Sequence, residues 1–478
     1  MNDNHIAVME TQVIVRSIIQ IIYFITALGI VFVIISENRN PLKTISWALL
    51  LLLFPIGGII IYYFFGQDAR KLRIISRKSY RKLKKRTYEP LVLHNDTEAY
   101  AEYSPLVKLL NRNNDSALLQ GSEVEIYTDG KEKFDALIRD MEVAEHHIHF
   151  QYYIFENDEI GNKIKEILIR KASEGVHVRV MYDDVANWRV KNRFYEEMEN
   201  HGVEVTPYLK VYFPLFTSKV NFRNHRKIVV VDGRIGYIGG MNVADRYLRP
   251  SWRDTHLRVT GRGVLGMQSA FLIDWYASGK EFLADKVYFP EMPIVTNNVM
   301  QIAMGDPMGK WKTLLQATTN IIMRAKNYIY IQTPYFLPTE GLVQSLQSAA
   351  LSGIDVRLMV PEHSDTRFVG TAARSYFEEM MNAGVKIYRM TPDFLHAKVM
   401  IVDDFITVVG SANMDFRSFE HNFEVNAYIY DANFAKKMKR IFFNDLQKCI
   451  QINLKNWKNR PRIQKFKESL LRVFAPLL

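Results

Sequence analysis

Two segments of the chain share a spacing of His, Lys and Asp that suits chemistry at a phosphodiester. Each has a His, one residue, a Lys, four residues and an Asp, and an Asn follows 17 residues after the His. One such match arises easily by chance, but two in one chain with the same downstream Asn indicate a repeated functional unit. The residues concerned are His225, Lys227, Asp232 and Asn242 in the first segment, and His396, Lys398, Asp403 and Asn413 in the second.

These residue types can divide the work of phosphodiester chemistry between the two segments. A neutral imidazole can attack phosphorus and form a phospho-histidine, while a second, protonated imidazole protonates the leaving oxygen. Histidine suits both tasks because its ordinary pKa of about 6.5 makes both forms accessible near neutrality. The lysines supply positive charge to the non-bridging oxygens, and the asparagines supply hydrogen bonds.

The spacing also predicts which motif residues face the reaction. The Val- and Ile-rich runs indicate strands, in which side chains alternate between faces, so each Lys shares the face of its His. Asp232 and Asp403 fall on the opposite face, and Gly233 after Asp232 is a turn signal. We therefore expect the two aspartates to support strand ends rather than contact substrate.

Each catalytic His needs a partner that fixes its second ring nitrogen. Asp254 lies 29 residues after His225, and Glu424 lies 28 residues after His396. Both carboxylates stand at the start of an alternating strand, so they are the candidates for this supporting role.

The two motifs lie in an internal repeat, with one unit beginning near Glu123 and the other near Trp311. Each unit has a strand ending in Gln (Gln151 and Gln332), an amphipathic helix, a Gly and a second strand. Helices that alternate with short β-rich strands predict the α/β class. We expect two duplicated units that form a pseudo-twofold body.

The N-terminal part contains two long apolar runs, Ser17 to Ile35 and Ile45 to Phe65, separated by a short polar break. Each run is long enough to cross roughly 30 Å of hydrocarbon. A buried helical hairpin is the alternative, but neither run has a polar face. The pattern predicts a transmembrane hairpin with spans at about 17–35 and 45–65.

The formal net charge of +11 arises almost entirely from one segment. Ten of the 62 Lys and Arg residues lie between residues 70 and 86, with no acidic residue among them. Basic residues beside a span indicate the cytoplasmic side, and they also attract anionic lipid. We expect a multi-pass protein of the cell membrane with its catalytic body in the cytoplasm. The nearly neutral remainder disfavours nucleic-acid binding, which needs phosphate neutralisation over a broad surface.

The predicted organisation is a hairpin over 1–66, a basic linker over 67–115, a first repeat over 116–290, a second repeat over 291–445 and a helical tail over 446–478. In the tail, a basic amphipathic helix from Ile463 to Val473 is expected to pack against the body rather than insert into the membrane. The apolar segment from Tyr208 to Phe222 is either a buried loop or a lip that admits acyl chains. Cys449 is the single cysteine, so no cysteine metal cluster is possible, and no metal site is predicted.

The twin motifs resemble those of the phospholipase D superfamily, and more closely those of bacterial cardiolipin synthases. The finer likeness comes from Asn40-Pro41 between the apolar runs, and from the stretches 333–338, 394–398, 410–418, 422–425 and 475–478. The resemblance implies that one phosphatidylglycerol donates its phosphatidyl group, releasing glycerol, and a second accepts it. It implies no organic cofactor, His225 as the nucleophile and His396 as the general acid.

Other functions remain open on the sequence. A membrane-bound phospholipase D hydrolase or another phosphatidyltransferase would use the same motifs with a different acceptor. A nuclease is disfavoured by the neutral body, and a non-catalytic scaffold by two intact motifs. Oligomeric state is not indicated.

Overall fold

The computed structural model describes residues 3–36, 41–54, 56–66, 103–211, 221–294 and 296–475. The chain divides into two compact units, residues 1–69 with 211–221, and residues 70–210 with 222–478. The basic segment 70–86 and most of the apolar segment 208–222 lie outside the described residues, as do the last three residues of the chain.

The N-terminal unit contains one long apolar helix, α1 (Asp3–Ser36). Its stretch Thr11–Ser36 is long and apolar enough to cross a membrane. The second apolar run is divided into α2 (Pro41–Leu53), α3 (Gly57–Ile61) and a π-helical turn, Tyr62–Gly66. In the sequence, Pro55 falls between α2 and α3, and Gly57 and Gly58 begin α3; these residues disfavour a continuous helix.

The break brings the parts of the second run together. The rings of Trp47 and Tyr62 lie edge to face with centroids 5.4 Å apart, and Ile34 of α1 packs with Leu51 and Tyr62. A straight helix would separate residues 47 and 62 by roughly 22 Å. The predicted hairpin of two full-length spans is therefore not confirmed. In the described part of the chain, one helix has the length and composition of a span.

The larger unit, called the body below, contains two mixed sheets with the same strand order. The first sheet has the order β2 (Ser122–Tyr127), β9 (His256–Gly261), β7 (Ile235–Gly239), β6 (Ile228–Val231), β3 (His147–Tyr152), β4 (His177–Asp183) and β5 (Glu204–Tyr208). The second has β10 (Val299–Gly305), β19 (Glu424–Tyr430), β17 (Ile406–Gly410), β16 (Val399–Val402), β11 (Tyr328–Gln332), β13 (Asp355–Pro361) and β14 (Lys386–Met390), flanked by β1 (Leu119–Gln120) and β20 (Cys449–Gln451). The predicted α/β duplication is confirmed.

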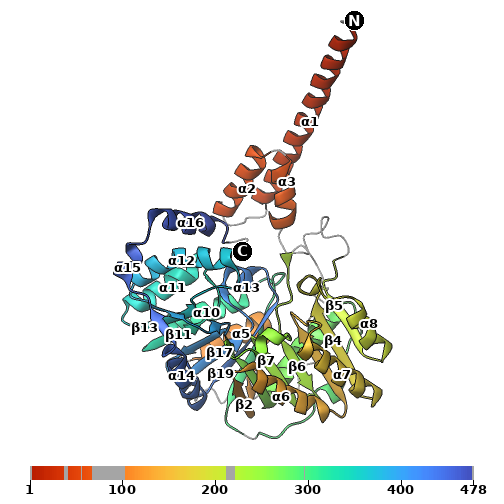
Figure 1. The fold of residues 1–478 in the computed structure, drawn as a ribbon, viewed down its shortest axis with the longest axis vertical. Coiled ribbons are helices and arrows are strands. Elements are labelled where there is room, and N and C mark those ends of the chain that lie inside the picture. The colour runs from red at the N-terminus through yellow and green to blue at the C-terminus, as the bar shows by residue number, and fades with distance from the viewer. Residues whose placement is uncertain are drawn as a thin grey trace. The chain divides into compact units, whose positions relative to one another are not determined.

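Helices connect the parallel strands and cover the sheets (Figure 1). The first repeat contributes α6 (Gly130–Glu142), α7 (Glu159–Ser173), α8 (Arg193–Asn200) and α9 (Gly263–Ala277). The second contributes α10 (Thr313–Arg324), α11 (Glu340–Leu351), α12 (Arg367–Asn382), α13 (Phe416–Glu420) and α14 (Ala432–Leu446). The helix α5 (Ser104–Asn114) precedes the repeats, and α15 (Leu454–Lys458) and α16 (Arg462–Val473) follow them.

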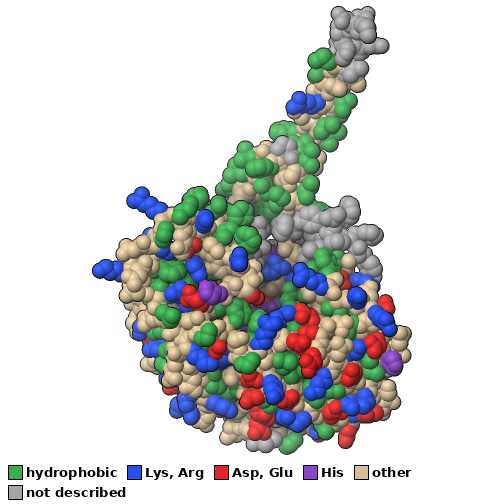
Figure 2. All heavy atoms as spheres, viewed as in Figure 1, with side chains coloured by type: hydrophobic (Ala, Val, Ile, Leu, Met, Phe, Trp, Pro, Cys, Tyr) green, Lys and Arg blue, Asp and Glu red, His purple; other side chains and the backbone are tan. Residues whose placement is uncertain are grey.

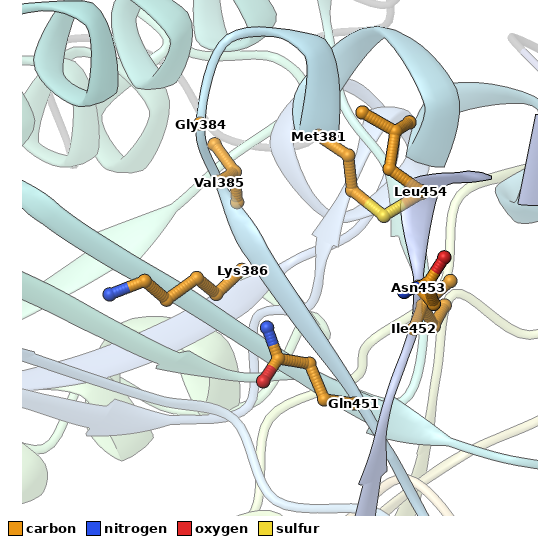
Figure 3. Close-up of a pocket in the computed structure, with 8 residues that line it drawn as sticks. All are labelled: Met381, Gly384, Val385, Lys386, Gln451, Ile452, Asn453 and Leu454. Carbon is orange, nitrogen blue, oxygen red and sulfur yellow. The ribbon is translucent and has the colours of Figure 1, made fainter.

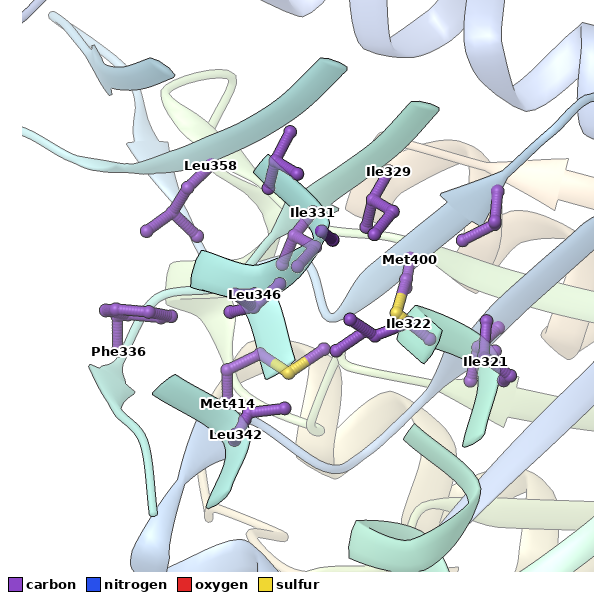
Figure 4. Packing of buried hydrophobic residues seen from close by; sticks show 14 of the residues in the cluster. Ile321, Ile322, Ile329, Ile331, Phe336, Leu342, Leu346, Leu358, Met400 and Met414 are labelled. Carbon is purple, nitrogen blue, oxygen red and sulfur yellow. The ribbon is translucent and has the colours of Figure 1, made fainter. Parts of the chain in front are cut away.

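Both faces of each sheet are buried, as the continuous apolar motif strands require. In β6, Ile228 and Val230 belong to an inner core shared by the two sheets, while Val229 and Val231 face the outer core of the first repeat. The strand β16 alternates in the same way between the inner core and the outer core of the second repeat, part of which is seen in Figure 4. The inner core holds the two motif strands in fixed relation to each other.

The tail contains a strand that the sequence did not reveal. The strand β20 pairs antiparallel with β14 at the edge of the second sheet. A hollow of about 430 Å³ lies beside this pair (Figure 3). None of its lining residues belongs to the His-Lys-Asp motifs; they are Met381, Gly384, Val385, Lys386, Gln451, Ile452, Asn453 and Leu454.

Both signs of charge are interspersed over the face of the body seen in Figure 2. Several carboxylates and basic groups are paired there and elsewhere, such as Arg258 with Asp140 at 2.7 Å and Lys165 with Glu197 at 2.7 Å. This mixture agrees with the nearly balanced composition outside residues 70–86.

Candidate active site

Short backbone pairings bring the two motifs together. The two-residue strand β15 (Phe394–Leu395), which precedes His396, pairs with β8 (Trp252–Arg253), which precedes Asp254. An isolated bridge joins Asn224, before His225, to Phe423, before Glu424. The His225 N–H donates to the Phe423 carbonyl at 2.9 Å, and the His396 N–H donates to the Arg253 carbonyl at 2.7 Å. The His of each repeat is thus placed beside the candidate carboxylate of the other.

The resulting His–carboxylate pairs cross between the repeats. His225 Nδ1 lies 3.0 Å from both carboxylate oxygens of Glu424, and His396 Nδ1 lies 2.7 Å from Asp254 Oδ2. Both carboxylates are fully buried. The similar offsets along the sequence, 29 and 28 residues, placed one carboxylate in each repeat but gave no sign of the exchange. Each half-site is completed by the opposite repeat.

Burial favours the uncharged form of both imidazoles. It lowers the pKa of His225 to about 4, against an opposing effect of Glu424. Burial, and then the nearby Lys398 ammonium, lower the pKa of His396, which Asp254 partly restores. A neutral ring that donates from Nδ1 to a carboxylate has its lone pair on Nε2. Both rings therefore have an Nε2 atom able to accept a proton or attack an electrophile.

The motif lysines are also buried, and they lie close to their histidines. Lys227 Nζ donates to the His225 carbonyl at 2.6 Å, and Lys398 Nζ donates to the His396 carbonyl at 2.5 Å. Burial lowers the pKa of Lys227 well below its usual value, and lowers that of Lys398 to about 8. The charge of Lys398 further lowers the pKa of Lys227. An anion between the two ammonium groups would relieve this repulsion, as a phosphodiester would.

The motif aspartates lie at the ends of the strands, away from the histidines. Asp232 accepts the backbone N–H groups of residues 145–147 at 2.8–2.9 Å, and Asp403 accepts those of residues 326–328 at 2.6–2.9 Å. Both residues adopt positive φ values, 53° and 54°, which Asp tolerates better than most side chains. This geometry joins each hairpin to the start of the neighbouring strand, the arrangement expected of a strand-end support.

Two details of the motifs differ from the pattern read in the sequence. The motif strands begin at Ile228 and Val399, one residue after the lysines, because the histidine segments pair with the opposite repeat instead. The Asn242 side chain accepts from the Ile154 N–H at 3.2 Å and donates to the Tyr247 hydroxyl at 2.5 Å, so it is bound to protein groups.

Asn413 differs from its counterpart in the first repeat. Its Nδ2 donates to Asp415 at 3.2 Å, while its buried Oδ1 has no hydrogen-bond partner among the described residues. A buried amide oxygen without a partner is uncommon in folded proteins. The amide of Asn413 is therefore the better placed of the two to contact a substrate group.

Comparison with known proteins agrees with this site. A family model described as "Cardiolipin synthase, PLD-like domain" matches residues 137–260 and 318–446, and one described as "Phospholipase_D-nuclease N-terminal" matches residues 21–67. A cardiolipin synthase of Alkalihalophilus pseudofirmus is 39% identical over 472 residues, covering 96% of this chain and 94% of that protein. One of Geobacillus sp. is 40% identical over 463 residues, covering 94% of this chain and 91% of that protein.

The chain belongs to the cardiolipin synthase family. The resemblance carried by the motifs is thereby confirmed. A crystal structure of phosphatidylserine synthase from Haemophilus influenzae matches with a TM-score of 0.57 at 15% identity, covering 78% of this chain and 98% of that protein. That likeness supports the same fold.

Two further buried carboxylates, Asp274 and Asp445, support the residues next to the site and were not predicted from the sequence. Asp274 accepts from Gln151 Nε2 at 2.6 Å and pairs with Arg226. At the equivalent place in the second repeat, Asp445 accepts from Gln332 Nε2 at 2.8 Å and pairs with Arg253 at 2.7 Å.

A signal for the first of these carboxylates was present in the sequence. The helix α9 is apolar on all sides apart from a few small or polar residues, and Asp274 is its one carboxylate. A lone carboxylate in a helix that must be buried requires a partner. The glutamine that ends the corresponding strand in each repeat pointed to the same contact.

Proposed function

We propose that this chain transfers a phosphatidyl group from one phosphatidylglycerol to a second, producing cardiolipin and glycerol. The observation that carries the proposal is the crossed pairing of His225 with Glu424 and of His396 with Asp254. This pairing makes one site with two oriented imidazoles, as a two-step transfer requires. The relatives align with more than nine-tenths of this chain, and their name, cardiolipin synthase, supports the same reaction.

In the first step, Nε2 of His225 attacks the phosphorus of the donor lipid. The bond between phosphorus and the headgroup glycerol oxygen breaks, and His396 gives its proton to that oxygen, so that glycerol leaves. Glu424 stabilises the positive charge that develops on His225, as a carboxylate does beside any attacking imidazole. Lys227 and Lys398 neutralise the non-bridging oxygens, and Asn413 Oδ1 can accept a hydrogen bond from a headgroup hydroxyl.

In the second step, the acceptor lipid takes the place of glycerol. His396, now neutral, removes the proton of a headgroup hydroxyl, whose oxygen attacks phosphorus. The bond from phosphorus to His225 breaks, and cardiolipin forms. Asp232 and Asp403 hold the strand ends, Asn242 holds the neighbouring loop, and the chemistry uses no metal ion or organic cofactor.

The acceptor decides between transfer and hydrolysis. Purified full-length protein in vesicles that contain phosphatidylglycerol should release glycerol and cardiolipin in equal amounts. Phosphatidic acid as the main product would instead identify a hydrolase and overturn the proposal.

The membrane arrangement belongs to the same proposal. The N-terminal region, residues 1–66, enters the bacterial cell membrane with both apolar segments, and the basic linker 67–115 meets anionic lipid on the cytoplasmic side. The repeats 116–290 and 291–445 and the tail 446–478 then lie in the cytoplasm. A reporter fused after residue 90 tests this topology, and activity of that reporter outside the cell would contradict it.

A further inference from the structure

The C-terminal helix α16 packs on the body with its polar side. Glu468 is 1% exposed and pairs with Arg460 at 2.8 Å, and Arg460 also pairs with Glu378 of α12 at 3.0 Å. Arg472 pairs with Glu379 of α12 at 2.8 Å, and its guanidinium lies over the Tyr376 ring at 4.1 Å. The predicted packing against the body is therefore present, but ionic contacts provide much of it.

The opposite side of α16 is apolar and exposed. Its side chains follow one helical face with the spacing i, i+3, i+7, i+10 and i+11, an arc of roughly 100° at 100° per residue. They are Ile463, Phe466, Leu470, Val473 and Phe474, exposed by 62%, 63%, 49%, 72% and 47%. Figure 2 shows hydrophobic side chains over α16 at the upper left of the body.

Leu471 of α16 packs against the core, but the other large apolar side chains of the helix face outward, whereas an ordinary surface helix turns its apolar stripe to the core. A contiguous apolar patch on the surface marks a contact with another molecule or with a membrane. Here a basic residue stands at each edge of the apolar arc around the helix. Arg462 and Lys467 are exposed beside the apolar arc, and neither pairs with a carboxylate within the described residues.

An apolar arc bordered by Lys and Arg fits one kind of partner, a bilayer with anionic headgroups. The apolar side chains reach the boundary of the acyl chains, while the basic groups contact phosphates. The long apolar helix α1 of the same chain is consistent with a nearby membrane.

We propose that the apolar face of α16 docks into the interface of an anionic membrane. This face gives the catalytic body a lipid contact of its own, in addition to the membrane contact of the N-terminal helices. The proposal does not depend on which reaction the site performs, because the contact lies on the tail.

Site-specific labelling of the full-length chain in vesicles tests this contact. Cys449 is the single cysteine, so a Cys449→Ser background accepts one fluorophore at a chosen position. Leu470→Cys labels the apolar arc, and Ser469→Cys labels the adjacent exposed position at the edge of the helix as a matched control. Phe24→Cys in α1 reports that the protein is in the bilayer.

With acyl-chain-brominated lipids and anionic headgroups, the label at 470 should be quenched strongly and the label at 469 weakly. Replacing anionic by zwitterionic lipid should reduce the quenching at 470, because the basic residues lose their partners. The double variant Ile463→Ser, Phe466→Ser should also lose the bromine quenching at position 470. An unchanged thermal unfolding midpoint of that variant would show that the body is folded.

Quenching at position 24 without quenching at position 470 would overturn the proposal. Self-quenching at 470 that rises with protein density, without bromine quenching, would overturn it in favour of a second copy of the chain on this face. Equal bromine quenching at 469 and 470 would show that the apolar arc does not orient the helix and would also count against it.

Discussion

The crossed pairing makes a prediction that a self-contained half-site would not make. Replacing Glu424, in the second repeat, should disable His225, in the first repeat. The change Glu424→Gln keeps the volume of a fully buried side chain that lies 3.0 Å from His225 Nδ1. It removes the charge that opposes the effect of burial on the pKa of His225.

The magnitude follows from what the carboxylate does in the reaction. A hydrogen bond to a charged group is worth about 1.5–3 kcal/mol, which corresponds to roughly 10- to 150-fold in rate. A glutamine can also donate to Nδ1 and hold the ring in the wrong tautomer, and in a comparable triad that loss reaches about 10⁴-fold. We therefore expect kcat to fall by about 10- to 10⁴-fold in Glu424→Gln, toward the upper end if the tautomer changes.

The assay is trapping of the phospho-histidine by a rapid alkaline quench, using a phosphatidyl donor with a good leaving group. In Glu424→Gln, label on the peptide that contains His225 should be lost. In Asp254→Asn, which impairs His396 instead, that label should form and persist. The exposed Glu196→Gln serves as a control and should behave as the parent.

The opposite pattern, with label kept in Glu424→Gln and lost in Asp254→Asn, would refute the assignment of roles. Label lost on His225 in both variants, with normal thermal stability, would show that neither carboxylate acts on one His alone.

Three further changes follow from the same geometry. Replacement of either His225 or His396 by Ala should abolish transfer, measured as cardiolipin formed, because one site needs both rings; half the activity in either variant would be inconsistent with that site. The Lys398 ammonium, with a pKa lowered to about 8, is charged below that pH, so KM for lipid should rise as pH increases through about 8; Lys398→Arg should move this rise to higher pH, because Arg stays charged. A Cβ at Gly240 would lie 2.1 Å from Asp254 Oδ1, so Gly240→Ser should destabilise the fold by about 1–3 kcal/mol in urea unfolding, and an unchanged midpoint would contradict the close packing.

The sequence predicted the parts of this protein that depend on local patterns. The duplicated α/β units followed from repeated strands and helices, and the supporting place of Asp232 and Asp403 followed from strand alternation and a turn signal. The exchange of carboxylates between repeats was not predictable, because it depends on how two sheets pack through a shared inner core. The division of the second apolar run was not predicted, because the prediction rested on apolar length, whereas Pro55, Gly57 and Gly58 disfavour a continuous helix.

The two half-sites are related by the repeat, but they are not equivalent. Glu424 also accepts from Ser411 Oγ at 2.5 Å and Asn422 Nδ2 at 3.2 Å, which fix its carboxylate beside His225. Asp254 has the glycine at 240 where Glu424 has Ser411, and it accepts from the backbone N–H of Thr255 at 2.7 Å.

The lysines add the asymmetry that bears on the roles of the histidines. Lys398 Nζ lies 3.0 Å from Nδ1 and 3.2 Å from Nε2 of His396, so its charge opposes protonation of that ring. Lys227 Nζ, like Lys398 Nζ, donates to the backbone carbonyl of its own His. Burial is the main cause of the lowered pKa of both histidines, but the neighbouring lysine has a larger effect than the carboxylate on His396 and a smaller one on His225, whose pKa is about 4. When a phosphodiester binds, its negative charge offsets that of Lys398, and the pKa of His396 rises. This difference supports the proposed roles, in which His225 attacks as a neutral ring and His396 gains its proton once the phosphodiester is bound.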